Sequence, residues 1–322
     1  PELGTYHAAW RAAASDDDTR HAGSSGGVLT ALATWLVESG EVSAVVATAQ
    51  DPDVRARSRA VIAEQRTEVL ATAGSRYAPV ENLTTWKARP DVALVAKPCE
   101  VSAARRLIAR TDAPSPAPLL SFFCAGTPSQ RATEALITKL GVRVEEVDEL
   151  RYRGRGWPGD FRVSDVRGTR RTMSYKESWG GNLGRDLQWR CKTCVDGTGG
   201  DADLAVGDFW RTDSDGYPDF SEGAGESVLI ARTTRGLDLA LAAHAAGVVS
   251  LVPIKLDEVA KIQPLQIQRR RLLLGRLLGR RLAGKPGPRY RGFGLLKSAS
   301  RRPISTVRAL LGTMRRTWEH RK

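Results

Sequence analysis

The sequence predicts a mixed α/β (α+β) fold, and three observations lead to this prediction. Apolar strand-like and helical segments alternate in the first half, short β-prone pieces dominate the second half, and an arginine-rich helical extension ends the chain. A chain of 322 residues, 41% of them hydrophobic, can bury a substantial core without disulfides. We expect four parts, at residues 1–23, 24–140, 141–268 and 269–322.

Strand and helix signals alternate through residues 24–140. Apolar residues at helical spacing from Val28 to Leu36 predict a buried helix that follows a Ser-Ser-Gly-Gly turn and ends at Gly40. Strands are expected at 42–48, 58–63, 91–96 and 119–123, and helices at 67–73, 100–110 and 129–140. A strand, a loop with a cysteine and a helix therefore follow one another twice.

Residues 141–268 consist of shorter β-prone pieces separated by Gly, Pro and Asp. Candidate strands lie at 142–152, 161–166, 171–175 and 204–209, and a strand, a helix and a strand follow at 227–231, 234–246 and 248–252. These pieces predict a sheet-rich second half.

The positive charge of the chain lies in its last part. Of 49 Lys and Arg and 36 Asp and Glu residues, 17 and 1 fall in 269–322, so the remaining 32 basic and 35 acidic residues nearly balance. The extension ends in a predicted helix over 306–318, with Val307, Leu310, Leu311, Met314 and Trp318 on one face. Such a segment is typical of an attachment device. We rank a membrane surface or a protein partner ahead of nucleic acid, because few aromatic residues are available to stack on bases.

No apolar run approaches the roughly 18 to 20 residues of a membrane span, and the polar start of the chain does not resemble a secretory signal. We therefore expect a cytoplasmic protein, which is peripheral at the membrane if the extension binds lipid. The chain starts at Pro1 rather than at Met, which fits a trimmed sequence.

Four cysteines occur, Cys99, Cys124, Cys191 and Cys194, and in a reducing cytosol they should not form disulfides. Four thiolates are a full ligand set for a tetrahedral zinc or a cubane iron–sulfur cluster. Cys191 and Cys194 form a Cys-x-x-Cys turn before several glycines, which suits a cluster, half a zinc site or a dithiol redox pair. Cys99 and Cys124 each stand where a strand gives way to a helix, which is where α/β proteins build sites. Buried structural cysteines are the alternative.

The turn Ser24-Ser25-Gly26-Gly27 precedes the first predicted buried helix. Unobstructed backbone N–H groups and the helix dipole favour an anion at such a turn. A helix cap is the simpler interpretation. Further along, Arg151, Arg153 and Arg155 alternate along a predicted strand and would share one face, which suits an acidic substrate or a solvated surface.

Together, these segments resemble the coenzyme F420 hydrogenase/dehydrogenase beta-subunit family. The resemblance rests on the ordered occurrence of residues 24–32, 74–77, 97–101, 122–129, 154–159 and 191–208, and it covers roughly residues 20–236. It implies a bound FAD and at least one 4Fe–4S cluster, with the four cysteines as its ligands. Many relatives carry a further ferredoxin-like cysteine cluster at the front, which this sequence lacks. The resemblance therefore implies one cubane, and either a separate electron donor or direct hydride transfer to the flavin.

The resemblance also implies where the flavin binds, namely in the 24–140 part. By analogy, the FAD pyrophosphate is held by Ser24, Ser25, Gly26 and Gly27, and the flavin lies near Ser75, Arg76, Tyr77 and Lys97. Lys97 would stabilise negative charge on a reduced ring. No catalytic acid or base is evident from the sequence.

We therefore expect an oxidoreductase that joins one-electron transfer through a cluster to hydride chemistry at a flavin. The expected substrate is a small natural-product, glycan or lipid intermediate or coenzyme F420 itself, and the expected electron donor is a ferredoxin or this deazaflavin. A homo-oligomer is compatible with the sequence. The alternative is a non-enzymatic, zinc-stabilised binding module that its basic extension recruits to a membrane or a partner.

Overall fold

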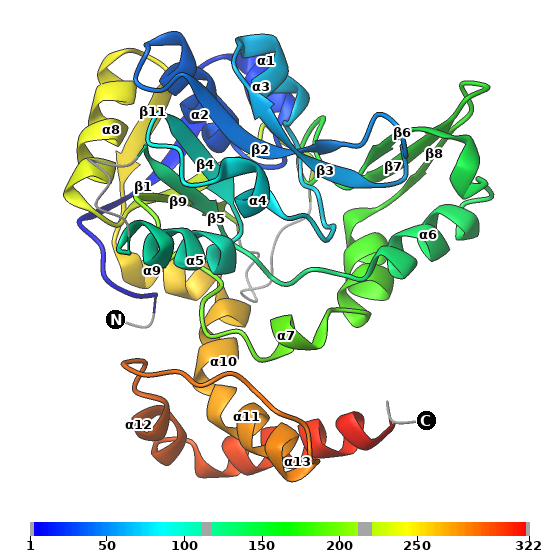
Figure 1. The fold of residues 1–322 in the computed structure, drawn as a ribbon, viewed down its shortest axis with the longest axis vertical. Coiled ribbons are helices and arrows are strands. Elements are labelled where there is room, and N and C mark those ends of the chain that lie inside the picture. The colour runs from blue at the N-terminus through cyan, green and yellow to red at the C-terminus, as the bar shows by residue number, and fades with distance from the viewer. Residues whose placement is uncertain (1–2, 111–116, 212–220, 320–322) are drawn as a thin grey trace.

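A large mixed sheet forms the centre of the molecule, and a small antiparallel sheet stands beside it (Figure 1). The structure is a computed structural model and describes residues 3–110, 117–211 and 221–319. In spatial order, the large sheet consists of β11 (Val249–Pro253), β1 (Ala8–Ala14), β10 (Ser227–Ala231), β9 (Leu204–Asp208), β5 (Leu119–Phe122), β4 (Val92–Ala96), β2 (Ala44–Gln50) and β3 (Ser58–Ala63).

The middle of this sheet is parallel. β2, β4, β5 and β9 run in one direction, while β3 and β10 pair with them antiparallel. The carboxyl ends of the four parallel strands therefore meet at one edge, which is where α/β proteins place their ligands. The predicted mixed α/β class is confirmed, although no strand was predicted for β1, which pairs with both β10 and β11.

Both faces of the large sheet are buried because its strands alternate between two cores. Val45 and Ala47 of β2 belong to a core with α2 (Val28–Glu38) and α8 (Thr234–Ala245), whereas Ala44 and Val46 belong to a core on the other face. That second core includes α4 (Asn82–Trp86) and α5 (Pro98–Ile108). The period of two that a strand imposes thus produces a three-layer arrangement.

The small sheet consists of β6 (Val147–Arg151), β7 (Phe161–Asp165) and β8 (Arg170–Met173). Its core is shared with α6 (Gln130–Lys139), whose Leu136 and Ile137 are buried with Leu150 and Phe161. A π-helix at Lys176–Asn182 follows the sheet, and α7 (Trp189–Lys192) then leads into the Cys-x-x-Cys turn. Near the amino terminus, α1 (Asp17–Ala22) and α3 (Arg66–Ala71) complete the helices of the first half.

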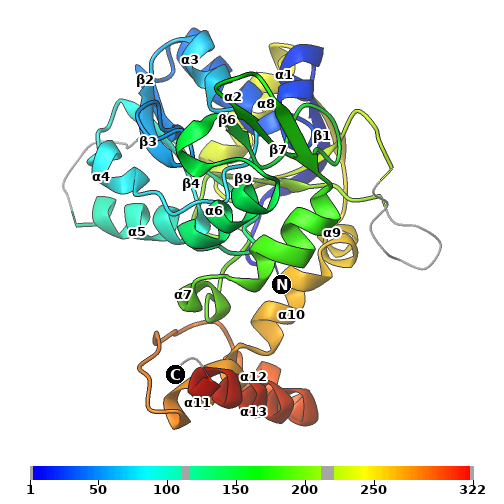
Figure 2. The same ribbon diagram turned by 90° about the vertical axis from the view of Figure 1, so that its right-hand side faces the viewer.

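The basic extension is helical, as predicted, and it forms a separate lobe below the large sheet (Figures 1 and 2). After α9 (Leu256–Ile262), α10 (Pro264–Arg271) leads from the body to α11 (Leu273–Leu282), α12 (Leu295–Ser300) and α13 (Pro303–Glu319). Ile267 of α10 is buried against Val228 and Ile230 of β10, so α10 is anchored in the body. Among the described residues, no helix combines the length and the apolar character needed to cross a membrane.

Candidate cofactor and cluster site

A cavity of about 300 Å³ lies at the carboxyl edge of β2, β4, β5 and β9. Of the eight residues predicted to bind a cofactor, seven line this cavity, namely Ser24, Ser25, Gly27, Ser75, Arg76, Tyr77 and Lys97. Gly26 does not line it. Of the four cysteines, Cys124 lines the cavity. Segments from residues 23 to 266 thus contribute to one site, although their roles in binding stay a prediction.

The Ser24-Ser25-Gly26-Gly27 turn is fixed against β10. The Gly26 N–H donates to Ser227 Oγ at 3.0 Å, and its carbonyl accepts from the Ala14 N–H at 2.7 Å. A Cβ on Gly26 would lie 2.8 Å from the Ala12 carbonyl oxygen, so only glycine fits there. The Gly26 N–H therefore binds Ser227 and does not face the cavity. The sequence had suggested that this N–H would be available to an anion.

The start of α2 faces the cavity without a cap. Gly27 occupies the N-cap with a φ of 69°, and no side chain in the described chain accepts from the first turn. Val28, Leu29 and Thr30, whose N–H groups begin the helix, line the cavity. The first N–H groups of a helix need acceptors and carry the positive end of its dipole. This helix start therefore suits an anion. The simpler interpretation of the turn, a side chain that caps α2, is not found among the described residues.

Arg76 brings a second positive group to the cavity. Its Nη1 donates to the Leu150 carbonyl at 2.7 Å, and no carboxylate within the described ranges forms an ion pair with it. Burial lowers the pKa of Arg76 to about 10, so the side chain stays charged at neutral pH. A desolvated cation without a carboxylate partner favours an anionic ligand. By contrast, Lys97 is already paired with Glu100 at 3.1 Å.

Arg153 is a buried residue of the cavity wall that binds the turn in front of α2. Its guanidinium pairs with Asp208 at 2.8 Å and donates to the carbonyls of Pro158 and Ser24. Aromatic rings surround it, with the centroids of Tyr175, Trp157 and Trp210 at 4.7, 5.2 and 5.6 Å. Burial opposes its charge most strongly, but Asp208, Tyr77 and Tyr175 together outweigh burial and raise the pKa of Arg153. Arg153 therefore holds the serine turn in place.

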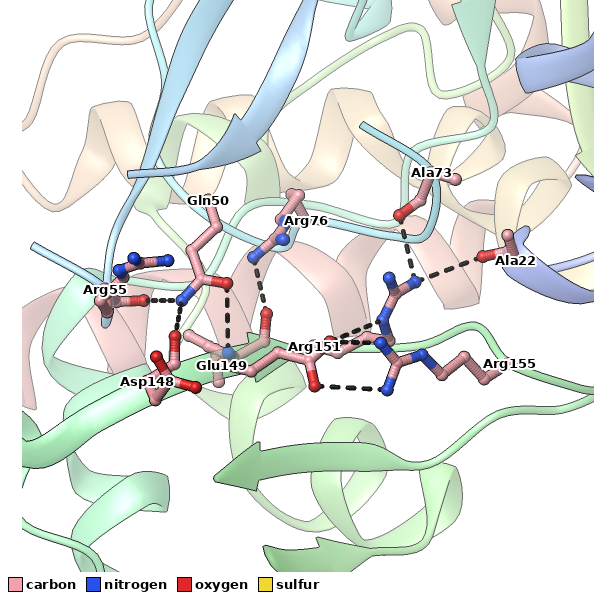
Figure 3. Close-up of polar contacts among 10 residues, drawn as sticks. Ala22, Gln50, Arg55, Ala73, Arg76, Asp148, Glu149, Arg151 and Arg155 are labelled. Atoms are coloured by element: carbon pink, nitrogen blue, oxygen red, sulfur yellow. Dashed lines mark hydrogen bonds and ion pairs between the residues drawn. The ribbon is translucent and has the colours of Figure 1, made fainter. Parts of the chain in front are cut away.

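The predicted common face of Arg151, Arg153 and Arg155 is wrong, because β6 ends at Arg151. Arg151 Nη1 donates to the carbonyls of Ala22 and Ala73 at 3.3 and 3.2 Å, while Arg155 turns back with a φ of 59° to Glu149 at 2.7 Å (Figure 3). Figure 3 also shows Arg76, whose guanidinium donates to the Leu150 carbonyl of the same strand. Arg151 thus ties the small sheet to α1 and to the loop after α3, whereas Arg155 binds back to β6 itself, and neither lines the cavity.

The four cysteines come from three parts of the chain. Cys99 lies in the first turn of α5, Cys124 follows β5, Cys191 lies in α7 and Cys194 follows that helix. The Cys124 N–H donates to the Gly197 carbonyl at 2.8 Å, and the Thr127 N–H donates to Cys191 Sγ at 3.3 Å. The loop after β5 that carries Cys124 and the Cys-x-x-Cys segment are therefore bonded to each other.

The Cys99 thiol lies within electrostatic range of Cys191 and Cys194, and the Cys124 thiol within range of Cys99 and Cys191. Although Cys99 is solvent-accessible, the surrounding protein raises the pKa of its thiol to about 11, and Cys194 and Cys191 add to this. Desolvation raises the pKa of Cys124 to about 12 against the charge of Arg269, and Cys99 and Cys191 contribute as well. Within the described ranges, no three Cys, His, Asp or Glu side chains are arranged to hold a single metal ion.

The basic extension contacts the cysteine loops, which the sequence did not predict. Gln266 Nε2 and Arg269 Nη1 of α10 donate to the Cys124 carbonyl at 3.3 and 3.1 Å. On the other side, Arg276 donates to the Lys192 carbonyl at 3.3 Å, and Tyr290 Oη donates to the Thr193 carbonyl at 3.0 Å. Gln266, which precedes the predicted boundary at 269, therefore already contacts the Cys124 loop, and residues beyond that boundary contact the Cys-x-x-Cys turn.

The fold and the cavity define an α/β protein in which an uncapped helix start, the buried Arg76 and Cys124 line one cavity at the carboxyl edge of the sheet. The chain belongs to the coenzyme F420 hydrogenase/dehydrogenase beta-subunit family. The model of the amino-terminal part of that family matches residues 9–87, and the model of its carboxyl-terminal part matches residues 90–257. Membership places the chain among iron–sulfur oxidoreductases.

Two known proteins are similar to the chain. The coenzyme F420-dependent sulfite reductase of Methanocaldococcus jannaschii is 24% identical over 268 residues, which cover 77% of this chain and 38% of the reductase. The chain thus spans well under half of that relative. A chain of the F420-reducing NiFe hydrogenase complex from Methanosarcina barkeri matches with a TM-score of 0.66 and 21% identity, covering 89% of this chain and 97% of that one. The second similarity concerns the fold.

Proposed function

We propose that the chain is an oxidoreductase that depends on FAD and one 4Fe–4S cluster. One observation carries the proposal: Cys124, whose thiol neighbours Cys99 and Cys191, lines the same cavity as the uncapped start of α2. A single cavity therefore borders both an anion site and the cysteine group. When bound there, the flavin supplies hydride transfer and the cluster supplies one-electron transfer, which joins two-electron substrates to one-electron carriers.

The residues of the cavity fit the phosphates of FAD. The first N–H groups of α2 and the guanidinium of Arg76 offer positive charge, and Ser24 and Ser75, whose hydroxyls lie 2.8 Å apart, line the cavity beside them. Arg153 fixes the backbone of Ser24 through a hydrogen bond to its carbonyl. The apolar part of the lining includes Leu29, Tyr77 and Phe123, which suits an aromatic ring system.

The cysteine group fits a cluster because neighbouring thiols in a desolvated site resist ionisation. The raised pKa values of Cys99 and Cys124 mean that thiolates form there only beside a strong positive charge, which the iron ions would supply. The Thr127 N–H already donates to Cys191 Sγ, and such bonds to ligand sulfur tune a cluster. Cys99, Cys124, Cys191 and Cys194 would be the ligands.

Coenzyme F420 is the substrate or electron donor that we favour. Both similar proteins are named for F420, and the cavity offers a buried cation to an anionic molecule. A small natural-product, glycan or lipid intermediate would then be reduced, with a ferredoxin as the alternative donor. Sulfite reduction is not proposed, because the chain spans only 38% of the sulfite reductase.

The test is the oxidation and reduction of the anaerobically purified protein. Reduced coenzyme F420, reduced ferredoxin and nicotinamide cofactors are each mixed with the protein, and the flavin and cluster absorbance is followed. We expect bleaching of both chromophores by reduced F420 and no bleaching by nicotinamide. A colourless protein with bound zinc would support the binding-module alternative instead. If the protein is coloured but only ferredoxin reduces it, the proposal of FAD and a cluster stands, and the proposal of F420 as electron donor is wrong.

A further inference from the structure

Exposed apolar side chains are concentrated on α10 to α13, the helices that connect to and form the lobe. Eight of the sixteen exposed large apolar side chains lie on α10 to α13, namely Leu265, Leu278, Leu282, Leu296, Ile304, Val307, Leu311 and Trp318. On α13, the exposed fractions of Ile304, Val307, Leu311 and Trp318 are 76, 53, 52 and 48%. Their spacing of three, four and seven residues puts them on one face of the helix. We call these four residues the apolar stripe.

The packing of α13 on α11 fixes the direction in which the apolar stripe points. A Cβ on Gly275 would lie 2.3 Å from the Thr306 carbonyl oxygen, and a Cβ on Gly279 would lie 2.2 Å from that of Leu310. The two glycines therefore let the helix backbones approach closely. Because Thr306 and Leu310 face α11, the apolar stripe lies on a different side of α13 and cannot turn inward without undoing this contact.

Basic side chains accompany the apolar stripe. Arg301, Arg308, Arg315 and Arg316 are exposed on or beside α13, and Lys285, Arg289, Arg291 and Lys297 are exposed on the preceding segment. Residues 269–322 carry 17 basic residues and 1 acidic residue. This lobe therefore presents an apolar stripe together with a strong positive charge.

The helix α13, which carries the apolar stripe, lies away from the large sheet. Both views show the lobe of α11, α12 and α13 standing apart from the large sheet, to which α10 connects it (Figures 1 and 2). The family models end at residue 257, so the lobe lies outside the matched part of the chain. The positioning of the cavity residues does not require the apolar stripe to be exposed.

We propose that the apolar stripe binds an anionic lipid bilayer. The α13 helix would lie in the plane of the interface, with Ile304, Val307 and Leu311 in the boundary between headgroups and acyl chains and Trp318 at the headgroup level. The arginines would contact lipid phosphates. Charge complementarity selects this partner, because a basic helix with one apolar face binds anionic membranes through burial and electrostatics together. A nucleic acid would use the arginines but leave the apolar stripe in water.

The experiment is co-sedimentation of the full-length holoprotein with vesicles. Vesicles of phosphatidylglycerol and phosphatidylcholine are compared with vesicles of phosphatidylcholine alone, at low and high salt. We expect binding to the anionic vesicles that weakens as salt rises, because screening reduces the attraction of the arginines. Binding is expected whether or not the protein is reduced, and therefore does not depend on the proposed redox function.

Two variants separate the apolar and the electrostatic contributions. I304S/L311S keeps the charge and should weaken binding about tenfold, because two exposed aliphatic side chains no longer enter the interface. R301Q/R308Q keeps the apolar stripe and should weaken binding about fivefold for each charge removed. The matched controls are V166S and R170Q, which alter an exposed valine and an exposed arginine near the small sheet and should bind like the native chain.

The proposal is overturned if the native chain does not bind anionic vesicles, if it binds neutral vesicles equally well, or if I304S/L311S binds like the controls. Light scattering of the same samples without lipid gives a further readout. Self-association of the native chain that I304S/L311S abolishes, together with no vesicle binding, would make the apolar stripe an interface between copies of this chain. Circular dichroism of each variant shows whether its helix content is native.

Discussion

Arg153 and Asp208 form an ion pair, with Nη1 and Oδ2 2.8 Å apart, that connects the loop after β6 to the carboxyl end of β9. The Arg153 side chain is almost completely buried, and the same guanidinium donates to the Ser24 carbonyl. One cation thus ties the end of a parallel strand to the turn in front of α2. The shape of the cavity depends on this connection.

Arg153→Met should destabilise the fold strongly. Removing one partner of a buried pair leaves the other charge uncompensated and typically costs about 3 to 5 kcal/mol. We expect the free energy of unfolding in urea to fall by about 3 kcal/mol. Arg155→Met is the matched control, because its partner Glu149 is more accessible and such pairs contribute about 1 kcal/mol or less. Equal losses for the two variants would contradict the structural role of Arg153.

Gly26→Ala should abolish cofactor binding by displacing the turn. The new methyl group would lie 2.8 Å from the Ala12 carbonyl oxygen and 2.9 Å from the Ser227 nitrogen, so β1, β10 or the turn must shift. Gly180→Ala is the control, since a Cβ there has open space. The measurement is the amount of flavin released from each purified variant. Flavin retained at native levels by the Gly26 variant would show that the turn does not shape the binding site.

Arg76→Gln should weaken flavin binding while leaving the fold intact. Burial lowers the pKa of Arg76 to about 10, so the native residue presents a charged, desolvated group to the cavity at neutral pH. Replacing Arg76 removes its attraction to an anionic ligand, which weakens binding. It also removes the cost of burying a cation without a carboxylate partner, so the cofactor-free fold is not destabilised. We expect a dissociation constant for FAD at least about tenfold higher, equivalent to 1.4 kcal/mol, with no loss of thermal stability in the cofactor-free protein. An unchanged affinity would place the phosphates elsewhere.

Arg269→Gln should lower the reduction potential of the cluster. Arg269 donates to the Cys124 carbonyl, and its charge favours the thiolate of Cys124. A positive charge beside a cluster stabilises the reduced, more negative state, so its loss should shift the potential downward by tens of millivolts, where 59 mV corresponds to a factor of about ten. Potentiometric titration followed by electron paramagnetic resonance measures the shift. Arg281→Gln, which removes an exposed charge of the same lobe, should leave the potential unchanged.

Local patterns predicted most of the large sheet and the residues of its carboxyl edge. The apolar run of β2, the buried face of α2 and the strand-to-helix transitions at Cys99 and Cys124 follow from spacing, whereas Arg76, Tyr77 and Lys97 were assigned to the cavity by the family resemblance. The strand β1 could not be predicted, because its alanine-rich sequence has no alternating pattern and its structure depends on pairing with β10 and β11. Pairing with strands more than 200 residues away therefore decides the structure of β1, and its local sequence does not.

Long-range contacts also explain what the sequence did not reveal about the site. Arg153 is separated from Asp208 by 55 residues and from Ser24 by 129, so its central position depends on the complete fold. The extension was interpreted as an attachment device because of its charge, yet α10 donates hydrogen bonds to the Cys124 carbonyl over more than 140 residues. No spacing within the extension signals this contact.

The most direct test of the central proposal is the composition of the anaerobically purified protein, measured for iron, acid-labile sulfide, zinc and FAD in the native chain and in Cys124→Ser. The account predicts about four iron and four sulfide per chain with bound FAD in the native protein, and loss of iron and sulfide with retained FAD in the variant. Native protein with stoichiometric zinc and neither iron nor flavin would contradict it.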